Sequence, residues 1–243
     1  MREIRVDAHG VPVLSYLRRE NAGQPWADRV EVLGAGAADV VLREMSGWAA
    51  TGPRGLGEEL LARGARLVRA THRMTCELSV RRPPEAWGSP SSPLEFEPLA
   101  LPVEDLIPAW RAAYAPGHPD YRDEYEDAAV VRDRFEALVA GTTYGPLSPL
   151  STVIRDGGVV VAGLLLNQFP AEVPWGGFLI TELFRHPAYP RAGTLLLRRT
   201  LARAAAEGLG VVGLVVTEGN PARRLYERHG FEVFESPMTV RIP

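Results

Sequence analysis

The sequence predicts an α/β protein built on a mixed β-sheet with helices on both faces. The first observation is the order of the expected elements over residues 96–243, which runs β-α-α-β-β-β-α-β-α-β-β. The second is the Asp156-Gly157-Gly158 turn, which stands between two apolar runs and indicates a β-hairpin. The third is composition: 46% apolar and 23% charged residues over 243 positions are typical of a soluble chain with a sizeable core.

The second half of the chain carries most of the apolar periodicity. Helices are expected over residues 103–115, 123–141, 192–208 and 221–230. Strands are expected at 96–102, on both sides of the hairpin within 151–169, at 176–184, at 211–218, and in the closing segments FEVFES and PMTVRIP. Gly141 and Gly208 stand where two of these helices should end.

The first half has the pattern of a smaller α/β domain. Strands are expected at 2–6, 11–17, 29–33 and 65–80, and helices through Met45 and over 57–64. Residues 81–98 are rich in proline, serine and glycine and show no apolar period. We therefore expect an N-terminal domain over 1–82, a linker over 83–95 and a second domain over 96–243.

A weak internal similarity joins the two halves. Residues 60–78 and 225–242 each contain a helix end, a glycine, a strand, a short turn and a strand with a methionine. Two interpretations stay open at this point. Either the first domain is a partial, degenerate copy of the second, or the similarity is accidental.

Charge and composition exclude several partners. The 27 basic and 30 acidic residues give a net charge of −3, so no overall basic field favours nucleic acid or an anionic membrane. No stretch approaches 18 uncharged apolar residues, and MREIRVDAHG lacks an apolar signal core, which indicates a cytoplasmic protein without a membrane partner. Every basic residue is an arginine, so a Walker lysine and Schiff-base chemistry are excluded.

No metal site is expected. Cys76 is the only cysteine, which excludes a disulfide framework and a multi-cysteine metal site. The five histidines show no metal-ligand spacing: His9, His72, His118, His186 and His229.

The most specific motif is TEGNPARRLYERHGFEVF at residues 217–234. It resembles the last conserved segment of the GCN5-related N-acetyltransferase (GNAT) superfamily, at positions Asn220, Ala222, Leu225, Tyr226, Gly230 and Phe231. Upstream, residues 182–208 are similar to the coenzyme A segment of the same family. There Pro190 and Leu195 depart from the family pattern, because the family has Arg or Gln at the first position and a small residue at the second.

The resemblance covers roughly residues 96–243. It implies a GNAT-like fold and an enzyme that transfers an acetyl group from acetyl-CoA, as co-substrate, to the amine of a small molecule or peptide. The amine would attack directly in a ternary complex, since no cysteine lies near the proposed site. No metal is implied.

A glycine-bearing loop that opens a helix suits a pyrophosphate, because it offers unpaired N–H donors at the positive end of the helix. The resemblance implies coenzyme contacts from Leu183, Phe184, Arg185, Arg191, Ala192, Gly193, Thr194, Asn220 and Arg223. Two departures weaken the expected cradle: Pro190 has no N–H to donate, and Leu195 replaces a small residue. For Gly193, an ordinary helix-start glycine is the alternative interpretation.

Two residues are candidates for proton transfer. Glu182 lies on the strand before the loop and would accept the amine proton directly or through water, because a protonated amine cannot attack a thioester. Tyr226 occupies the position where the family often has a phenol that protonates the departing sulfur. The alternatives are an exposed strand glutamate and a core tyrosine of an amphipathic helix.

The acidic stretch DYRDEYED at 120–127 lies in the connection that borders the acceptor site in the resembling fold. His118, Asp120 and Glu124 are the acceptor-binding candidates, because a negative rim attracts a cationic amine. Acids that stabilise the start of the second helix are the alternative.

Two other functions stay open. Pro190 and Leu195 leave room for a non-catalytic acyl-CoA-binding or interaction protein with a degenerate site. The GAGAAD segment at 34–39 follows an expected strand and imitates a dinucleotide or S-adenosylmethionine loop through Gly34 and Gly36, although Asp39 stands where the third glycine belongs.

Overall fold

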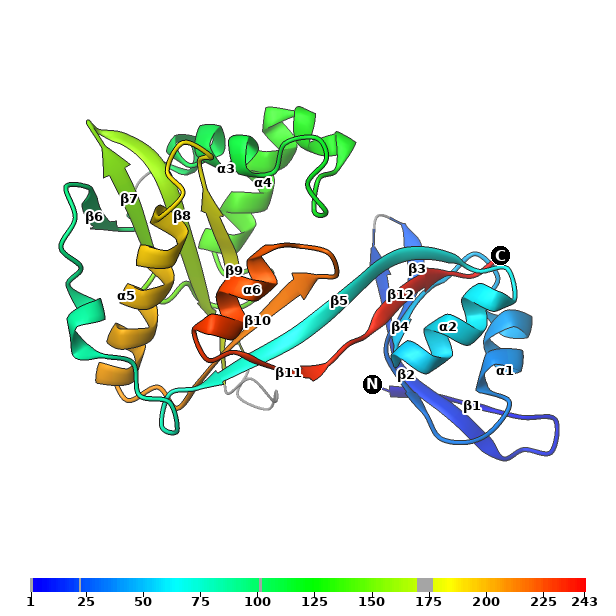
Figure 1. Ribbon diagram of the computed structural model, residues 1–243. Coiled ribbons are helices and arrows are strands. Elements are labelled where there is room, and N and C mark those ends of the chain that lie inside the picture. Colours follow the sequence, from blue (N-terminus) through cyan, green and yellow to red (C-terminus); the bar gives the residue numbers. More distant parts are fainter. Residues whose placement is uncertain (1, 22, 101, 170–176) are drawn as a thin grey trace. The chain divides into compact units, whose positions relative to one another are not determined.

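The computed structural model describes residues 2–21, 23–100, 102–169 and 177–243. It contains two compact units (Figure 1). Unit 1 combines Met1–Arg73 with Phe234–Pro243, and unit 2 is Met74–Val233. These boundaries differ from those expected at residues 82 and 96. The physical reason is that strand β5 (Arg66–Glu77) runs from one unit into the other, so the chain changes unit inside a strand.

The sheet of unit 2 is mixed, as the sequence predicts. Its strand order is β5-β10-β9-β8-β7-β6. The bounds are β6 Glu95–Pro98, β7 Thr152–Asp156, β8 Val159–Gln168, β9 Phe178–Arg185 and β10 Val211–Thr217. The pairs from β6 to β9 are antiparallel, whereas β9 and β10 are parallel.

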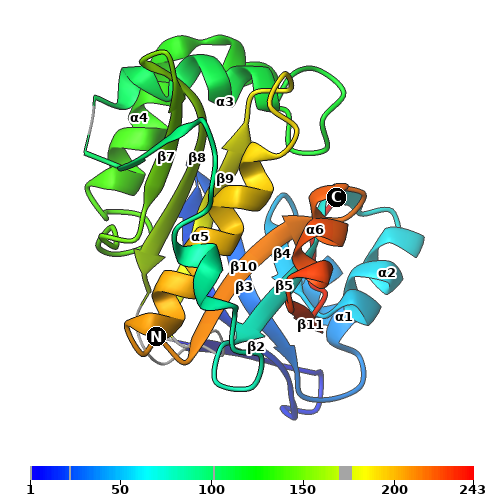
Figure 2. The ribbon, with the colours of Figure 1, turned by 60° about the vertical axis from the view of Figure 1, so that its left-hand side comes forward.

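Helices cover both faces of this sheet, as Figure 2 shows. On one face, α3 (Ile107–Ala113) and α4 (Ala128–Val139) enclose a core that contains Trp110, Phe135 and Phe184. On the other face, α5 (Ala192–Ala206) and α6 (Ala222–Arg228) pack a second core around Leu196, Leu197 and Phe231. The fold class predicted from the sequence is therefore confirmed.

The β7–β8 hairpin is confirmed at the expected turn. Gly157 and Gly158 both have positive φ, 54° and 83°, which is the backbone that a two-residue hairpin turn of this twist requires. Parts of the strands expected at 96–102 and 176–184 fall on residues 101 and 176, which lie outside the described residues.

Two expected helices are each divided. The first becomes a short 3-10 turn, η2 (Val103–Asp105), followed by α3, which has Pro108 in its first turn. The second becomes η3 (Asp123–Glu126) followed by α4, because Asp127 adopts an extended conformation and caps α4 by accepting from the Ala129 N–H at 2.8 Å. The acidic stretch thus contributes one helix cap.

The segment expected as a linker belongs to unit 2. It contains the 3-10 turn η1 (Glu85–Gly88). Arg199 of α5 donates to the Gly88 carbonyl at 3.0 Å, and the Arg198 guanidinium lies 4.9 Å from the centre of the Trp87 ring. These contacts hold residues 85–88 against α5.

Unit 1 has the strand order β1-β2-β3-β4-β12-β5. The bounds are β1 Arg2–Val6, β2 Pro12–Asn21, β3 Gln24–Val32, β4 Ala49–Gly52 and β12 Met238–Arg241. Helix α1 (Ala37–Glu44) joins β3 to its parallel neighbour β4, and α2 (Arg54–Ala62) follows. The order β-β-β-α-β-α-β therefore repeats that of β7 to β11, where β11 is Glu232–Glu235.

The internal similarity has a structural counterpart at the ends of α2 and α6. Gly64 and Gly230 both have positive φ, 99° and 91°. The following N–H groups return to equivalent carbonyls, Ala65 to Leu60 at 3.0 Å and Phe231 to Tyr226 at 3.1 Å. In this alignment the position of Tyr226 is taken in unit 1 by Leu60, a fully buried aliphatic residue.

Candidate active site

A cavity of about 370 Å³ lies in unit 2, where β9 ends and where α5 and α6 begin. Several sequence-predicted residues line it together: His118, Leu183, Phe184, Arg185, Thr194, Asn220 and Tyr226. Tyr114, Pro190 and Arg228 also line it. The structure therefore brings the family tail motif and the loop before α5 to one cavity.

The opening between β9 and β10 creates room for a ligand along β9. Within the described residues these strands pair only at Leu179 with Gly213 and at Ile180 with Leu214. Beyond Ile180, β9 is bonded to β8 on its other side, as Leu183 and Phe184 pair with Leu164 and Gly163. One edge of β9 thus keeps backbone donors and acceptors for a ligand.

Gly163 explains how β9 is held here. A Cβ at Gly163 would lie 2.5 Å from the Phe184 ring, so the ring needs a residue without a side chain opposite it. Phe184 is 2% exposed and belongs to the α3–α4 core. The side chain of Phe184 is therefore structural, although Phe184 is also one of the residues that line the cavity.

The start of α5 is free of protein caps in the described chain. Arg191 makes no side-chain cap, and no carbonyl accepts the N–H groups of Gly193 and Thr194. The Ala192 N–H, in contrast, donates to the Tyr189 carbonyl at 3.1 Å. Free amides at the positive end of a fifteen-residue helix suit an anion such as a pyrophosphate.

The two departures from the family pattern leave this helix start open. Pro190 precedes the helix cap, so its missing N–H is not one of the first-turn donors. Leu195 is packed against the α5–α6 core rather than into the loop. A Cβ on Gly193 would meet only the Arg185 side chain, at 3.7 Å.

Tyr226 of α6 lines the cavity and is 8% exposed. Burial, followed by the negative charges of Glu182 and Asp120, raises the pKa of its phenol. The phenol therefore keeps its proton at neutral pH and is available as a donor. Its ring also packs against Phe231, with centroids 5.8 Å apart. Tyr226 is therefore both a core residue of the α5–α6 side and a lining residue of the cavity.

Glu182 is not an exposed strand glutamate, because only 5% of it is accessible. One of its oxygens accepts from Trp110 Nε1 at 3.1 Å and from Tyr114 Oη at 3.3 Å. The other oxygen is paired with the Arg134 guanidinium. Glu182 does not itself line the described cavity, whereas Tyr114, which donates to its carboxylate, does.

Tyr114, Trp110 and Arg134 are site residues that the sequence did not indicate. Trp110 and Tyr114 fit the apolar spacing of α3, and this spacing predicts core residues. Burial raises the pKa of Tyr114 well above its usual value, and the charge of Glu182 adds to this effect. Glu182 in turn raises the pKa of Arg134, which stays positively charged.

Asp120 anchors the connection between α3 and α4. Its carboxylate accepts from Thr217 Oγ1 and from Asn220 Nδ2, the latter at 2.9 Å. Asn220 also caps α6, since its Oδ1 accepts from the Ala222 N–H at 2.8 Å. Asp120 therefore links this connection to the turn between β10 and α6.

His118 lines the cavity in its neutral form. Burial lowers the pKa of His118, and its Nδ1 accepts from the Asp120 N–H at 3.1 Å. Glu124 lies exposed on η3 and does not line this cavity.

The arginines near the cavity have different surroundings. Arg223 forms an ion pair with Glu227 along α6 at 2.8 Å, and Arg228 lines the cavity. Arg191 is exposed at the start of α5.

A parallel strand pair that opens beside an uncapped helix start, with the phenol of Tyr226 on the same cavity, fits the acyltransferase class that the tail motif implies. A model of the acetyltransferase (GNAT) family matches residues 104–231. The chain therefore belongs to the GNAT acetyltransferase family, whose members generally use acetyl-CoA as co-substrate. No curated protein matches the sequence.

Solved structures show the same fold. A GCN5-related N-acetyltransferase from Sphaerobacter thermophilus superposes with a TM-score of 0.63 at 15% identity, over 99% of this chain and 79% of that one. A tandem GNAT protein from the clavulanic acid biosynthesis pathway gives 0.56 at 16% identity, over 96% and 80%. A conserved protein of unknown function from Staphylococcus epidermidis gives 0.57 at 12% identity, over 89% and 83%.

The described residues show neither a candidate metal cluster nor a candidate membrane-spanning helix. In the described ranges, no group of three or more His, Cys, Asp or Glu side chains is placed to hold a metal ion. None of the described helices is long and apolar enough to cross a membrane.

The GAGAAD segment lies in unit 1. Gly36, with φ 81°, precedes the eight-residue helix α1, and Asp39 accepts from Arg63 at 2.7 Å. The segment therefore stands at the start of a helix that joins two parallel strands, as the loop before α5 does in unit 2.

Proposed function

We propose that the protein is an acetyl-CoA-dependent N-acetyltransferase whose active site is the cavity at Tyr226. The observation that carries this proposal is the free edge of β9 next to the uncapped start of α5, with the phenols of Tyr114 and Tyr226 on the same cavity. This arrangement supports binding of a long, thin ligand with an anionic end, and it supports proton transfer at the other end.

The chain offers a contact for each part of the coenzyme. The backbone of Leu183, Phe184 and Arg185 would pair with the amide groups of the pantetheine arm. The pyrophosphate would meet the first turn of α5, formed by Arg191, Ala192, Gly193 and Thr194. Asn220 would hold the arm from the α6 side, and Arg223 would face the phosphates together with Arg228.

Acetyl-CoA supplies the thioester. The acceptor nitrogen forms a bond to the carbonyl carbon, the carbon–sulfur bond breaks, and the sulfur takes a proton from Tyr226 Oη. Because burial keeps this phenol protonated, the donor is in the correct state at neutral pH. The reaction proceeds in a ternary complex, without a covalent enzyme intermediate.

Glu182 acts on the amine through Tyr114. The Tyr114 hydroxyl donates to Glu182, so its lone pairs remain available for an N–H of the acceptor. The proton that the amine loses passes along the same two groups, by way of Tyr114 Oη to the carboxylate of Glu182. His118 would border the acceptor side of the cavity, with Asp120 next to it, whereas Glu124 does not line this cavity and has no role in the proposal.

The test compares Tyr226→Phe with Tyr189→Phe. Both variants lose one phenolic oxygen, but Tyr189 Oη is bonded to Asp156 at 2.8 Å, away from the cavity. A positioned general acid contributes about 10²–10⁴-fold, so Tyr226→Phe should lower kcat by that factor while acetyl-CoA affinity stays unchanged. Tyr189→Phe should keep full activity.

Two results would count against this proposal. Full activity in folded Tyr226→Phe would remove Tyr226 as the acid. Acetyl-CoA binding without transfer to any amine in a broad panel would instead identify the non-catalytic binding protein.

A further inference from the structure

The connection between α3 and α4, residues 114–122, forms one wall of the active-site cavity. It contributes Tyr114 and His118 to the lining. Asn220, in the turn before α6, and Tyr226, within α6, line the same cavity. The shape of the cavity therefore depends on how the α3–α4 connection is held relative to the start of α6.

This connection has little apolar burial of its own. Residues 115–117 and Pro119 are exposed. Its backbone hydrogen bonds are local, from the His118 N–H to the Ala115 carbonyl at 3.0 Å and from the Tyr121 N–H to the His118 carbonyl at 2.9 Å. These bonds shape the connection but do not attach it to the rest of unit 2.

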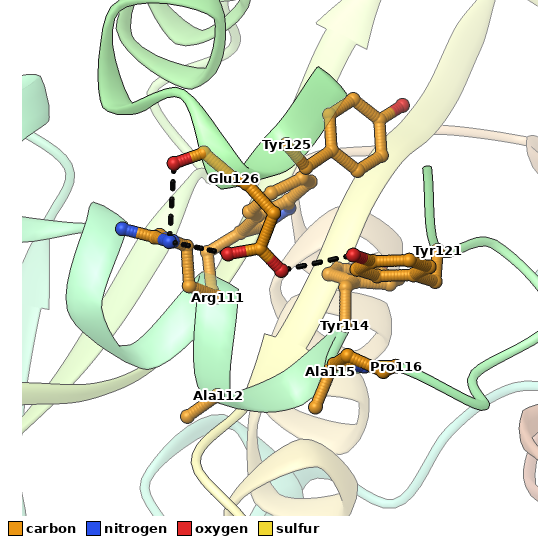
Figure 3. Close-up of a pocket in the computed structure, with 9 residues that line it drawn as sticks. Arg111, Ala112, Tyr114, Ala115, Pro116, Tyr121, Tyr125 and Glu126 are labelled. Atoms are coloured by element: carbon orange, nitrogen blue, oxygen red, sulfur yellow. Dashed lines mark hydrogen bonds and ion pairs between the residues drawn. The ribbon is translucent and has the colours of Figure 1, made fainter. Parts of the chain in front are cut away.

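One polar contact ties the connection back to α3. Figure 3 shows the Glu126 carboxylate between Arg111 and Tyr121. One oxygen accepts from Tyr121 Oη at 2.9 Å, and the other accepts from Arg111 Nη2 at 3.2 Å. These three side chains line a separate hollow of about 270 Å³, and none of them lines the active-site cavity.

Asp120 makes the tie that reaches the coenzyme side. Its carboxylate accepts from Asn220 Nδ2 at 2.9 Å and from Thr217 Oγ1, at sequence separations of 100 and 97 positions. Asn220 Oδ1 accepts from the Ala222 N–H at 2.8 Å, so a single orientation of the Asn220 amide satisfies both partners. The Asn220 side chain is thus fixed between Asp120 and the first turn of α6.

The sequence indicates Asp120 as an acceptor-binding residue, whereas its surroundings favour another role. Asp120 does not itself line the cavity, but His118 and Asn220 do. The Asp120 N–H donates to His118 Nδ1 at 3.1 Å, while its carboxylate holds Asn220. Asp120 therefore bridges two lining residues that stand on different elements.

We propose that Asp120 is a positioning residue: its carboxylate holds Asn220 and the α3–α4 connection in the one arrangement that binds acetyl-CoA. This inference rests on the proposed function, because it assigns how a coenzyme contact of that site is held. A hydrogen bond to a charged group favours the tied arrangement about tenfold or more. Without the tie, the affinity for a ligand falls with the population of the competent arrangement.

The first measurement is NMR hydrogen exchange of the backbone amides at positions 118, 120 and 121 in the full chain. Asp120→Ala removes both side-chain bonds and should accelerate exchange about tenfold. Asp120→Asn should restore the protection, because its amide oxygen can accept from Asn220 while its NH2 group donates to Thr217 Oγ1. Thr217→Val removes one bond and keeps the shape, so its exchange should be intermediate.

The second measurement is calorimetric affinity for acetyl-CoA. Asp120→Ala should weaken binding about tenfold, and Asp120→Asn should rescue most of this loss. A carboxylate that only attracts the acceptor amine predicts no weakening in either variant, because acetyl-CoA is itself anionic. Asp127→Ala is the matched control: it removes an acid of the same stretch that caps α4, so it should lower the urea midpoint and leave the acetyl-CoA affinity unchanged.

The inference is overturned if Asp120→Ala keeps either the wild-type exchange or the wild-type acetyl-CoA affinity, or if Asp120→Asn behaves like the alanine variant. Should Asp120→Ala fail to fold, Thr217→Val decides by the same two measurements. Wild-type protein that acetyl-CoA does not stabilise removes the proposed function and the coenzyme part of this inference, and the exchange rates then decide the tie alone. Tight wild-type binding with unchanged variants removes only the role of Asp120.

Discussion

Replacing Arg134 with methionine should destabilise the protein, because it leaves the buried carboxylate of Glu182 without its cationic partner. Glu182 is only 5% exposed, and Arg134 is the cation that faces its carboxylate. Removing one partner of a buried ion pair costs about 3–5 kcal/mol. Because the Arg134 side chain is 38% exposed, water partly replaces it, and we expect a loss of about 2–3 kcal/mol. For a unit of this size that corresponds to a Tm decrease of about 4–12 °C.

The measurement is urea unfolding followed by circular dichroism. Arg132→Met is the matched control, because Arg132 lies on the same helix and its ion pair with Glu104, at 3.2 Å, is exposed on both sides. Such a pair contributes about 0–1 kcal/mol. The double variant Glu182→Gln/Arg134→Met should recover part of the loss, since the amide has no charge to compensate.

Either of two results would contradict a stabilising ion pair between Glu182 and Arg134. One is a loss below about 0.5 kcal/mol in Arg134→Met, within the range of ordinary surface substitutions. The other is a double variant that is no more stable than Arg134→Met.

Two further predictions concern acidity and the coenzyme. Burial lowers the pKa of both His118 and His229 below the usual value. The stability that they contribute is therefore complete above about pH 6.5 and is lost as the pH falls through their folded pKa values. The urea midpoint should decrease from pH 7.5 to pH 5, and this decrease should be smaller in His229→Gln. Gly193→Asp should place a carboxylate at the uncapped start of α5 and weaken acetyl-CoA binding. The stabilisation of about 2.7 kcal/mol that acetyl-CoA at 100 times its Kd should give would then be lost. An unchanged calorimetric affinity for acetyl-CoA would place the phosphates elsewhere.

The fold was predictable where local chemistry determines it. Two glycines with positive φ define the β7–β8 turn, and the tail motif places Tyr226 on a short helix next to the strand pair. The units were less predictable, because the pairing of β12 with β5 joins residues that are far apart in sequence. Proline and serine in residues 83–95 indicated a linker, whereas contacts with Arg198 and Arg199 hold residues 85–88 of that segment against α5.

The candidate site shows a similar division. The residues near the start of α5 follow from a motif, whereas the environment of Glu182 depends on side chains 48 to 72 positions away. An aromatic pair with helical spacing, such as Trp110 and Tyr114, is the usual pattern of a core helix. Their hydrogen bonds to one buried carboxylate become evident only when α3 is packed on β9.

The boundary inside β5 has a consequence for synthesis on the ribosome. In the sequence, unit 2 is a continuous stretch inserted between the two segments of unit 1, so all of unit 2 leaves the ribosome before residues 234–243 do. β12 pairs with β4 on one side and with β5 on the other, and the sheet of unit 1 therefore cannot close until residues 238–241 have emerged. The unit that begins first is the one that finishes folding last, and a truncation of β12 leaves β4 and β5 with unpaired edges.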